Sequence, residues 1–159
     1  LTLHRTFVPE SQPATLARLA ELPRIAGVKD ATGDLARPWV ERQLIKKPFA
    51  WLSGEDATAV AYNIGGGQGC ISVTANVAPK LVAEVQNLTL AGEWQAAREL
   101  QDKLIPLHQA MFAEPSPAGA KYAVSLLGLC SEECRLPVMP LSDATRERIR
   151  QAMQALNLL

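Results

Sequence analysis

The sequence predicts an α/β fold in which parallel strands alternate with helices, followed by a region that contains helices only. As far as Leu90, short apolar runs alternate with stretches of helical spacing, which is the pattern of βα units. From Trp94 onward only helical spacing remains. The 159 residues are 48% hydrophobic and 20% charged, a composition typical of a globular protein with enough apolar material for a core.

Two helices are predicted in the first part of the chain, and each contains a proline where a helix tolerates one. Pro13 lies at the start of a helix over Ala14–Ala20, whose apolar residues return to one stripe. The second helix covers Asp34–Lys46, and Pro38 falls in its first turn, where a missing amide hydrogen costs no hydrogen bond. Both fit the helical half of a βα unit.

Apolar runs predict buried strands at Ile25–Lys29 and Phe49–Ser53. The first ends where a polar, glycine-containing turn begins, and Gly54 ends the second. Lys29 is thus expected at the end of an apolar strand, where α/β barrels display their catalytic groups. A lysine in that place is a candidate nucleophile, although a lysine after a strand is more often a solvated charge.

A glycine run separates a short helix from a third strand. The helix is expected over Glu55–Ile64, and Gly65–Gly67 ends it. Cys70–Val73 has the pattern of another buried strand, so the run is a tight turn and not a phosphate-binding loop, which would open a helix after a strand. A helix over Asn76–Leu90 follows, with its first residue as the cap and a proline in its first turn.

Three helices are predicted in the rest of the chain. An apolar stripe begins at Trp94, and Pro106 is expected to kink that helix. His108 on the same helix is expected to pack or to form a hydrogen bond rather than to bind a ligand. The second helix is Ala120–Leu129, and Ser142 starts the last one.

These elements amount to about half of a (β/α)8 TIM barrel. A complete barrel needs eight strands and about 250 residues, whereas this chain shows about three to four βα units. We therefore expect a partial barrel over residues 1–91 that carries Lys29, and an all-helical region over residues 92–159 that packs on it.

Charge and cysteine usage exclude several classes of partner. Sixteen basic and sixteen acidic residues give no net charge and no basic patch, so neither nucleic acid nor anionic lipid is expected to bind. No apolar stretch approaches the roughly 18 to 20 residues of a membrane span. The three cysteines form no CxxC pair, so we expect no metal, no cofactor and a reducing, cytoplasmic setting. A small neutral or anionic metabolite is the expected ligand.

Three ordered motifs resemble the dihydrodipicolinate synthase family. They are Gly27–Gly33 (GVKDATG), Leu52–Asp56 (LSGED) and Gly65–Asn76 (GGGQGCISVTAN). This family of pyruvate-dependent lyases acts in lysine (diaminopimelate) biosynthesis and belongs to the class I aldolase-like group that also contains N-acetylneuraminate lyase. The similarity runs from about Pro13 to the end of the chain, which implies the C-terminal half of the family barrel.

The resemblance implies that Lys29 forms a Schiff base with the keto group of pyruvate. Only a neutral amine attacks a carbonyl, and an apolar strand end favours that form. The iminium then acts as an electron sink, a proton leaves the pyruvate methyl group, and the enamine attacks the aldehyde of aspartate semialdehyde. Gly54 and Ile71 match family positions that line the pyruvate pocket, and the carbonyl of the isoleucine position assists proton transfer.

The start of the chain departs from the family pattern. The family uses a Tyr-Asn-x-Pro-x-Arg-Thr-Gly motif, in which the tyrosine relays protons and the arginine helps to bind a carboxylate. Counting back from Lys29 places that tyrosine at Leu1, and Arg5 is the candidate remnant of the arginine, in which case it would bind substrate. The first twelve residues otherwise differ from the family.

Two classes of function follow. In the first, the chain is an enzyme of the synthase type, with N-acetylneuraminate lyase or a keto-sugar-acid aldolase as the alternative; the segment Ser72–Asn76 favours the synthase. In the second, it is a truncated, catalytically silent relative that acts in assembly. Because the family's first half-barrel is expected to lie outside this sequence, we expect the chain alone to be incomplete, and to form a homo-oligomer or to associate with a missing half-barrel.

Overall fold

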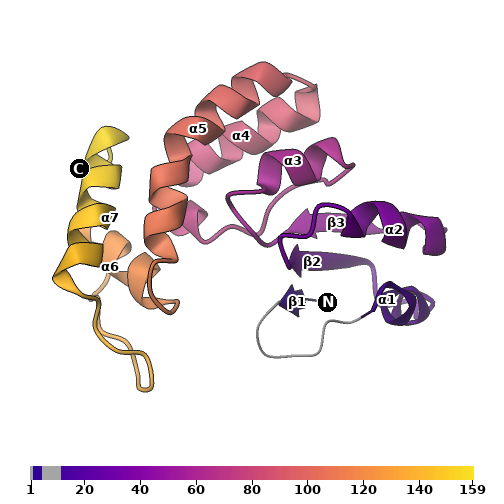
Figure 1. Cartoon of the computed structure of the whole chain (residues 1–159), viewed down its shortest axis with the longest axis horizontal. Coiled ribbons are helices and arrows are strands. Elements are labelled where there is room, and N and C mark those ends of the chain that lie inside the picture. The colour runs from indigo at the N-terminus through magenta and orange to yellow at the C-terminus, as the bar shows by residue number, and fades with distance from the viewer. Residues whose placement is uncertain (1, 5–11) are drawn as a thin grey trace. The chain divides into compact units, whose positions relative to one another are not determined.

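A computed structural model describes residues 2–4 and 12–159 of the chain. The chain divides into two compact units, coloured along the sequence in Figure 1. The first comprises Leu1–Ser72 and Gln86–Glu93, and the second comprises Val73–Val85 and Trp94–Leu159. Each unit is described below by itself.

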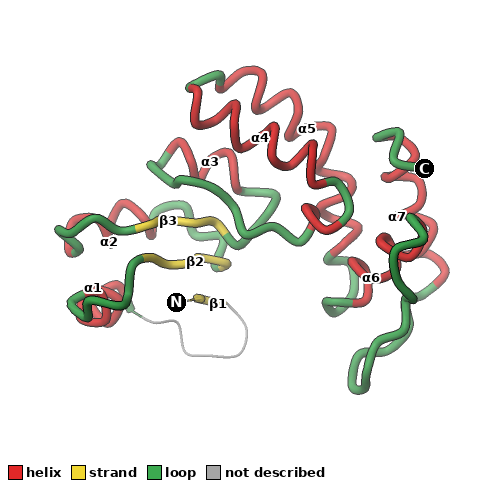
Figure 2. Tube along the Cα trace, turned by 180° about the vertical axis from the view of Figure 1, so that it is seen from behind, coloured by secondary structure: helices red, strands yellow, loops and turns green. Residues whose placement is uncertain are grey.

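The first unit contains a parallel sheet in the order β1-β2-β3, drawn in yellow in Figure 2. Its strands are β1 (Thr2–His4), β2 (Gly27–Ala31) and β3 (Ala50–Ser53). In the register of the sheet, Lys29 lies opposite Thr2 on one side and Leu52 on the other. β1 is a strand that the sequence pattern did not predict. Parallel strands joined through helices confirm the predicted α/β class.

Three helices accompany this sheet: α1 (Pro13–Ala20), α2 (Arg37–Leu44) and α3 (Ala59–Ile64). Burial alternates along β2 and β3, as expected where one face of a sheet is covered and the other is not. Val28 and Trp51 form a buried core with Leu16 of α1 and Tyr62 of α3. Removal of these side chains from water stabilises the unit and fixes which face of β2 carries Lys29.

The strand predicted over Ile25–Lys29 is displaced by two residues, so Lys29 lies at the middle of β2 and not at its end. Ile25 belongs to the preceding turn, where its amide donates to the Leu22 carbonyl at 3.1 Å. The strand extends to Ala31, which pairs with His4 of β1, and the backbone carbonyl of Asp30 still accepts a hydrogen bond from the Gly54 amide.

The prediction of a third strand over Cys70–Val73 is wrong, because this segment forms no regular strand. One bridge joins Cys70 to Ser53 of β3, and the amide of Gln68 already donates to the Trp51 carbonyl at 2.9 Å. The pairing therefore begins before Cys70 and ends at Ile71, whose amide donates to the Ser53 carbonyl at 2.8 Å. The chain then turns into a short 3-10 helix, η1 (Thr74–Asn76).

The predicted capping role of Asn76 is also wrong. Its side-chain amide donates to the Val73 carbonyl at 2.9 Å within η1, and α4 (Pro79–Ala91) begins three residues later. Pro79 opens α4, as predicted. In the first unit, Asn63 of α3 donates to Gln86 and Thr89 of α4, both at 2.8 Å, and so fastens residues 86–93 to the sheet-containing unit.

The second unit is built from α5 (Trp94–Met111), α6 (Ala118–Leu126) and α7 (Asp143–Ala155). α5 runs as one helix through Pro106. The fully buried side chains of this second unit include Leu107 and Met111 of α5 and Ile149 and Met153 of α7. His108 is buried and its Nδ1 lies 2.7 Å from Thr74 Oγ1, which confirms the predicted packing and hydrogen-bonding role.

The ends of α6 and α7 follow local signals in the sequence. α6 ends at Leu126, earlier than predicted, and the chain reverses at Gly128, where a φ of +73° favours glycine. Ser142 caps α7, as predicted, because its hydroxyl accepts from the Thr145 amide at 3.3 Å. Glu114 accepts hydrogen bonds from the backbone and hydroxyl of Ser142. A hydrogen bond from the Thr145 side chain, together with those from Ser142, lowers the pKa of the Glu114 carboxyl.

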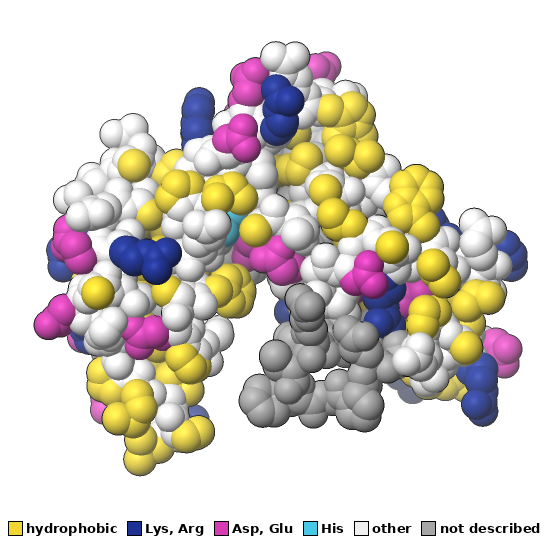
Figure 3. Space-filling view, viewed as in Figure 1, with side chains coloured by type: hydrophobic (Ala, Val, Ile, Leu, Met, Phe, Trp, Pro, Cys, Tyr) yellow, Lys and Arg dark blue, Asp and Glu magenta, His cyan; other side chains and the backbone are white. Residues whose placement is uncertain are grey.

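The loop between α6 and α7 exposes large apolar side chains, visible as a yellow group in Figure 3. They include Leu129, Leu136 and Met139, whose side chains are 73%, 82% and 66% exposed.

Across residues 2–4 and 12–159, no helix has the length and apolar character needed to cross a membrane.

Candidate functional site

Lys29 lies on the face of β2 that the helices do not cover. The buried Val28 and Asp30 flank it along the strand, and Lys29 itself is half-buried. Because side chains alternate between the two faces of a strand, the ammonium group projects away from the core formed by Val28 and Trp51. The lysine is therefore held by a rigid central strand and remains open to a small molecule.

Gly54 lies directly beneath the Lys29 side chain, immediately after β3. A Cβ atom added to Gly54 would lie 2.7 Å from Lys29 Cε, 3.0 Å from its Cγ and 2.9 Å from the Ala31 Cβ. Real Cβ atoms do not approach other atoms so closely, so the path of the lysine requires glycine at this position. The Gly54 amide donates to the Asp30 carbonyl at 2.7 Å and fixes the two residues to each other.

Two side chains shape the turns that end these strands. The Ser53 hydroxyl donates to the Glu55 carbonyl at 2.9 Å and accepts from the Glu55 amide at 3.1 Å. At the end of β2, Asp30 Oδ1 accepts from the amide and the hydroxyl of Thr32, at 2.9 and 2.7 Å. Side-chain hydrogen bonds to neighbouring backbone stabilise tight turns, so both ends of the site are held by short-range contacts.

Ile71 reaches the same region through the segment that pairs with β3. Its amide donates to the Ser53 carbonyl, one residue before Gly54, and its side chain is 47% exposed. The structure thus brings Lys29, Gly54 and Ile71 to adjoining chain segments. Arg5, the fourth residue expected at the site, lies outside the described residues.

The sequence analysis did not identify two further features near the lysine. Burial raises the pKa of the Cys70 thiol to about 12, Asp56 adds to the shift, and Ser53 and Lys29 oppose it. Ser72 donates a short hydrogen bond to Asp56, which is only 2% exposed. Both features depend on side chains that meet across the turn after β3, which no local sequence signal reports.

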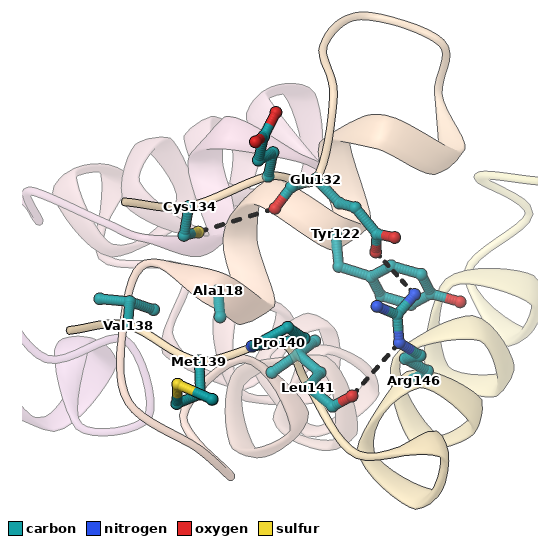
Figure 4. A pocket seen from close by; sticks show the side chains of 10 residues that line it. Ala118, Tyr122, Glu132, Cys134, Val138, Met139, Pro140, Leu141 and Arg146 are labelled. Carbon is teal, nitrogen blue, oxygen red and sulfur yellow. Dashed lines mark hydrogen bonds and ion pairs between the residues drawn. The ribbon is translucent and has the colours of Figure 1, made fainter. Parts of the chain in front are cut away.

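A separate cavity of about 280 Å³ lies in the second unit, lined by residues of α6, α7 and the loop between them (Figure 4). Arg146 dominates its polar wall: it pairs with Glu132 at 2.6 Å, donates to the Leu141 carbonyl at 3.3 Å and lies over the Tyr122 ring. These interactions already occupy its guanidinium, and no lysine is among the described residues that line the cavity.

Within residues 2–4 and 12–159, no group of three or more His, Cys, Asp or Glu side chains could hold a metal ion. The chemistry that the described site offers is that of a half-buried amine whose side chain lies against Gly54. An amine so placed can attack a carbonyl and form an imine.

Comparisons with known proteins identify the relatives of this chain. Residues 7–156 match the model of the dihydrodipicolinate synthetase family. A 4-hydroxy-tetrahydrodipicolinate synthase from Ruegeria pomeroyi is 57% identical over 152 residues, which are 96% of this chain and 52% of the relative. The dihydrodipicolinate synthase of Acinetobacter baumannii, solved as a complex with pyruvate, superimposes with a TM-score of 0.88 at 38% identity over 94% of this chain and 52% of that one. Another solved dihydrodipicolinate synthase gives a TM-score of 0.93 at 34% identity, covering 100% of this chain and 55% of that one. The chain thus spans about half the length of the relatives it matches.

Proposed function

Because the chain belongs to the dihydrodipicolinate synthetase family, we propose that it carries the Schiff-base lysine of a synthase that condenses pyruvate with aspartate semialdehyde. The observation that carries this proposal is the close passage of the Lys29 side chain over Gly54. A Cβ atom built on Gly54 would lie 2.7 Å from Lys29 Cε. A lysine held in one direction by the backbone beneath it is suited to repeated attack on a carbonyl.

In the proposed reaction, the neutral Lys29 amine adds to the keto carbon of pyruvate, and loss of water gives an iminium. The positive iminium draws electrons from the neighbouring methyl group, so a proton leaves and an enamine forms. The enamine carbon bonds to the aldehyde carbon of aspartate semialdehyde. Ring closure by the amine of that substrate then displaces Lys29, which becomes free again.

The other proposed site residues do not react; they provide room, backbone groups and a carboxylate partner. Gly54 leaves room for the lysine and the ligand that it holds, and Ile71 offers its backbone beside β3. We assign substrate carboxylate binding to Arg5 because a guanidinium pairs with a carboxylate through two parallel hydrogen bonds.

At the level of the fold, we propose that the chain forms the C-terminal half of a (β/α)8 TIM barrel, with about three to four βα units, followed by an all-helical region. The partial barrel comprises residues 1–91, ending with α4, and the helical region comprises residues 92–159. A half-barrel leaves sheet edges to be covered. The proposal therefore includes pairing with the complementary half-barrel or with another copy, in the cytoplasm.

Two alternatives are less well supported. A sugar-acid lyase related to N-acetylneuraminate lyase would use the same lysine, but the matched relatives reported above all carry the synthase name. A catalytically silent relative would not need glycine at position 54. The backbone there makes room for the Lys29 side chain, which would have no catalytic role in such a protein.

A turnover assay with both substrates tests the proposal. Lys29→Arg keeps the charge but removes the amine that can form an imine, and it should reduce turnover by more than a thousandfold. Lys47→Arg is the matched control, since Lys47 Nζ donates to the Leu22 and Ile25 carbonyls and lies outside the proposed site. Turnover by Lys29→Arg that is measurable and equal to that of the unaltered protein would refute the proposal.

A further inference from the structure

The segment that carries Ile71 pairs unevenly with the edge of β3 that faces away from β2. The amide of Gln68 donates to the Trp51 carbonyl at 2.9 Å, and the amide of Ile71 donates to the Ser53 carbonyl at 2.8 Å. Three steps along the segment therefore match two steps along β3, whereas a regular ladder advances equally on both strands. One extra residue in a ladder is a β-bulge, which bends the chain and changes the direction of its side chains.

Gly69 lies within this bulge. Its φ of +153° belongs to a range that residues with a side chain rarely adopt. Its carbonyl accepts from the Ser53 amide at 2.9 Å, so the glycine still pairs with β3. The extra residue is therefore accommodated where the chain is free to adopt an unusual backbone conformation.

Gln68 supplies both hydrogen-bond partners of the Trp51 backbone on this edge. Its amide donates to the Trp51 carbonyl, and its side-chain Oε1 accepts from the Trp51 amide at 3.1 Å. In a regular parallel ladder these partners would be backbone groups of two different residues. The Gln68 side chain thus takes the place of a backbone carbonyl at the start of the bulge.

Gln68 also has the only side chain between Ile64 and Cys70, because the other four residues of GGGQG are glycines. Backbone pairing is the same at every residue, so in this run only the glutamine side chain distinguishes one register from the next. Gln68 is exposed, and water can bond to the Trp51 amide in its place. Water would satisfy that amide without fixing the register.

The register decides which residue comes next to the site of Lys29. As observed, Ile71 pairs with Ser53, the residue before Gly54. Without the extra residue, Cys70 would take that place and Ile71 would move by about 3.3 Å along the strand direction. The segment is close to the amine: burial raises the pKa of the Cys70 thiol to about 12, and the charge of Lys29 is near enough to oppose that shift.

We propose that Gln68 is a positioning residue, which bonds to both backbone groups of Trp51 and so locks the register that holds Ile71 at the site of Lys29. This inference rests on the proposed synthase function and deepens it. Gln68 acts through Ile71, whose carbonyl is expected to assist proton transfer. Lys29 is held separately, by β2 and Gly54. Loss of the lock should therefore slow the departure of the proton from the methyl group of the pyruvate imine more than it slows formation of the imine.

The two steps can be measured separately. In D2O, the proton that leaves the methyl group passes to solvent and a deuteron returns, so deuterium in recovered pyruvate reports proton transfer. Borohydride trapping reports the imine. Gln68→Met keeps the side-chain length but lacks the oxygen; it should lower deuterium exchange at least about tenfold and imine formation less than about threefold. Gln68→Glu keeps an oxygen that can accept from the Trp51 amide and should restore exchange. Gln154→Met, at an exposed position of α7, is the matched control and should change neither rate.

Alkylation of Cys70 tests the register without pyruvate. A slip by one residue takes the thiol out of its present position, so Gln68→Met should speed labelling of Cys70 by iodoacetamide at least about tenfold. Gln68→Glu and Gln154→Met should label as slowly as the unaltered protein.

Three results would overturn the proposal: equal labelling of Cys70 in all variants, unchanged exchange in Gln68→Met, or an equal loss of exchange in Gln68→Met and Gln68→Glu. Failure of the unaltered protein to form an imine on Lys29 would instead contradict the proposed function. In that case the labelling of Cys70 still decides whether Gln68 sets the register.

Discussion

The side chain of Lys29 crosses the backbone of Gly54 so closely that a Cβ on the glycine would lie 2.7 Å from the lysine Cε. Lys29 belongs to the central strand β2 and Gly54 to the turn after β3, and a 2.7 Å hydrogen bond from the Gly54 amide to the carbonyl of Asp30, the residue after Lys29, joins the turn to the strand. The glycine therefore sets the direction in which the amine points.

Gly54→Ala is expected to lower the rate of imine formation with pyruvate at least tenfold. The new methyl group would lie 2.7 Å from Lys29 Cε and 2.9 Å from the Ala31 Cβ, so both the lysine side chain and Ala31 must shift. Tenfold corresponds to about 1.4 kcal/mol in the barrier. The measurement is single-turnover trapping of the imine. Ser131→Ala, at an exposed position of the loop between α6 and α7, is the control; an equal loss of rate in both variants would contradict the account.

Cys70 is expected to react slowly with iodoacetamide in the folded protein. Its pKa of about 12, against an ordinary 9.0, leaves about a thousandfold less thiolate at neutral pH. The exposed Cys130 serves as the internal comparison. Mass spectrometry of partially alkylated protein measures both rates. The difference should disappear in urea, and rapid labelling of Cys70 under native conditions would show that the thiol is not held as described.

Ser142→Ala is expected to destabilise the second unit by about 1 kcal/mol, the usual cost of losing a helix cap. The substitution removes the hydroxyl that accepts from the Thr145 amide and donates to Glu114. Thermal unfolding measures the effect. Ser131→Ala in the exposed loop between α6 and α7 should leave the midpoint unchanged, and a shift of the same size there would show that the cap contributes nothing of its own.

Leu104→Ala in α5 is expected to cost about 2 to 5 kcal/mol, because the side chain is fully buried and its removal leaves a cavity. Leu90→Ala, at a position that is 63% exposed, is the matched control and should cost less than about 1 kcal/mol. Urea denaturation compares the two. Similar costs would mean that α5 does not pack as the structure describes.

Local signals in the sequence were sufficient for most helices of the chain. Pro13 and Pro79 open α1 and α4, and Ser142 caps α7, because each acts on backbone groups within one turn. The end of β2 was predicted two residues early, since the contacts that extend the strand come from His4 of β1 and from Gly54, both distant along the chain.

For the candidate site too, local sequence features could be predicted and tertiary contacts could not. The motif around Lys29 could be recognised, whereas the contact of Lys29 with Gly54 depends on the register of β2 against β3. The burial of Glu41 was missed because periodicity marks it only as a polar residue on a helix. Its full burial, with Arg37 as its partner at 2.6 Å, is a tertiary effect.

The most direct test of the account is to incubate the protein with pyruvate, reduce it with borohydride and map the adduct by mass spectrometry. Reduction converts the imine into a stable secondary amine on the residue that formed it. The account predicts one pyruvate-derived adduct on Lys29, its absence from Lys29→Arg and its retention in Lys47→Arg. An adduct on a different lysine, or no adduct at saturating pyruvate, would contradict the central claim that Lys29 is the Schiff-base residue.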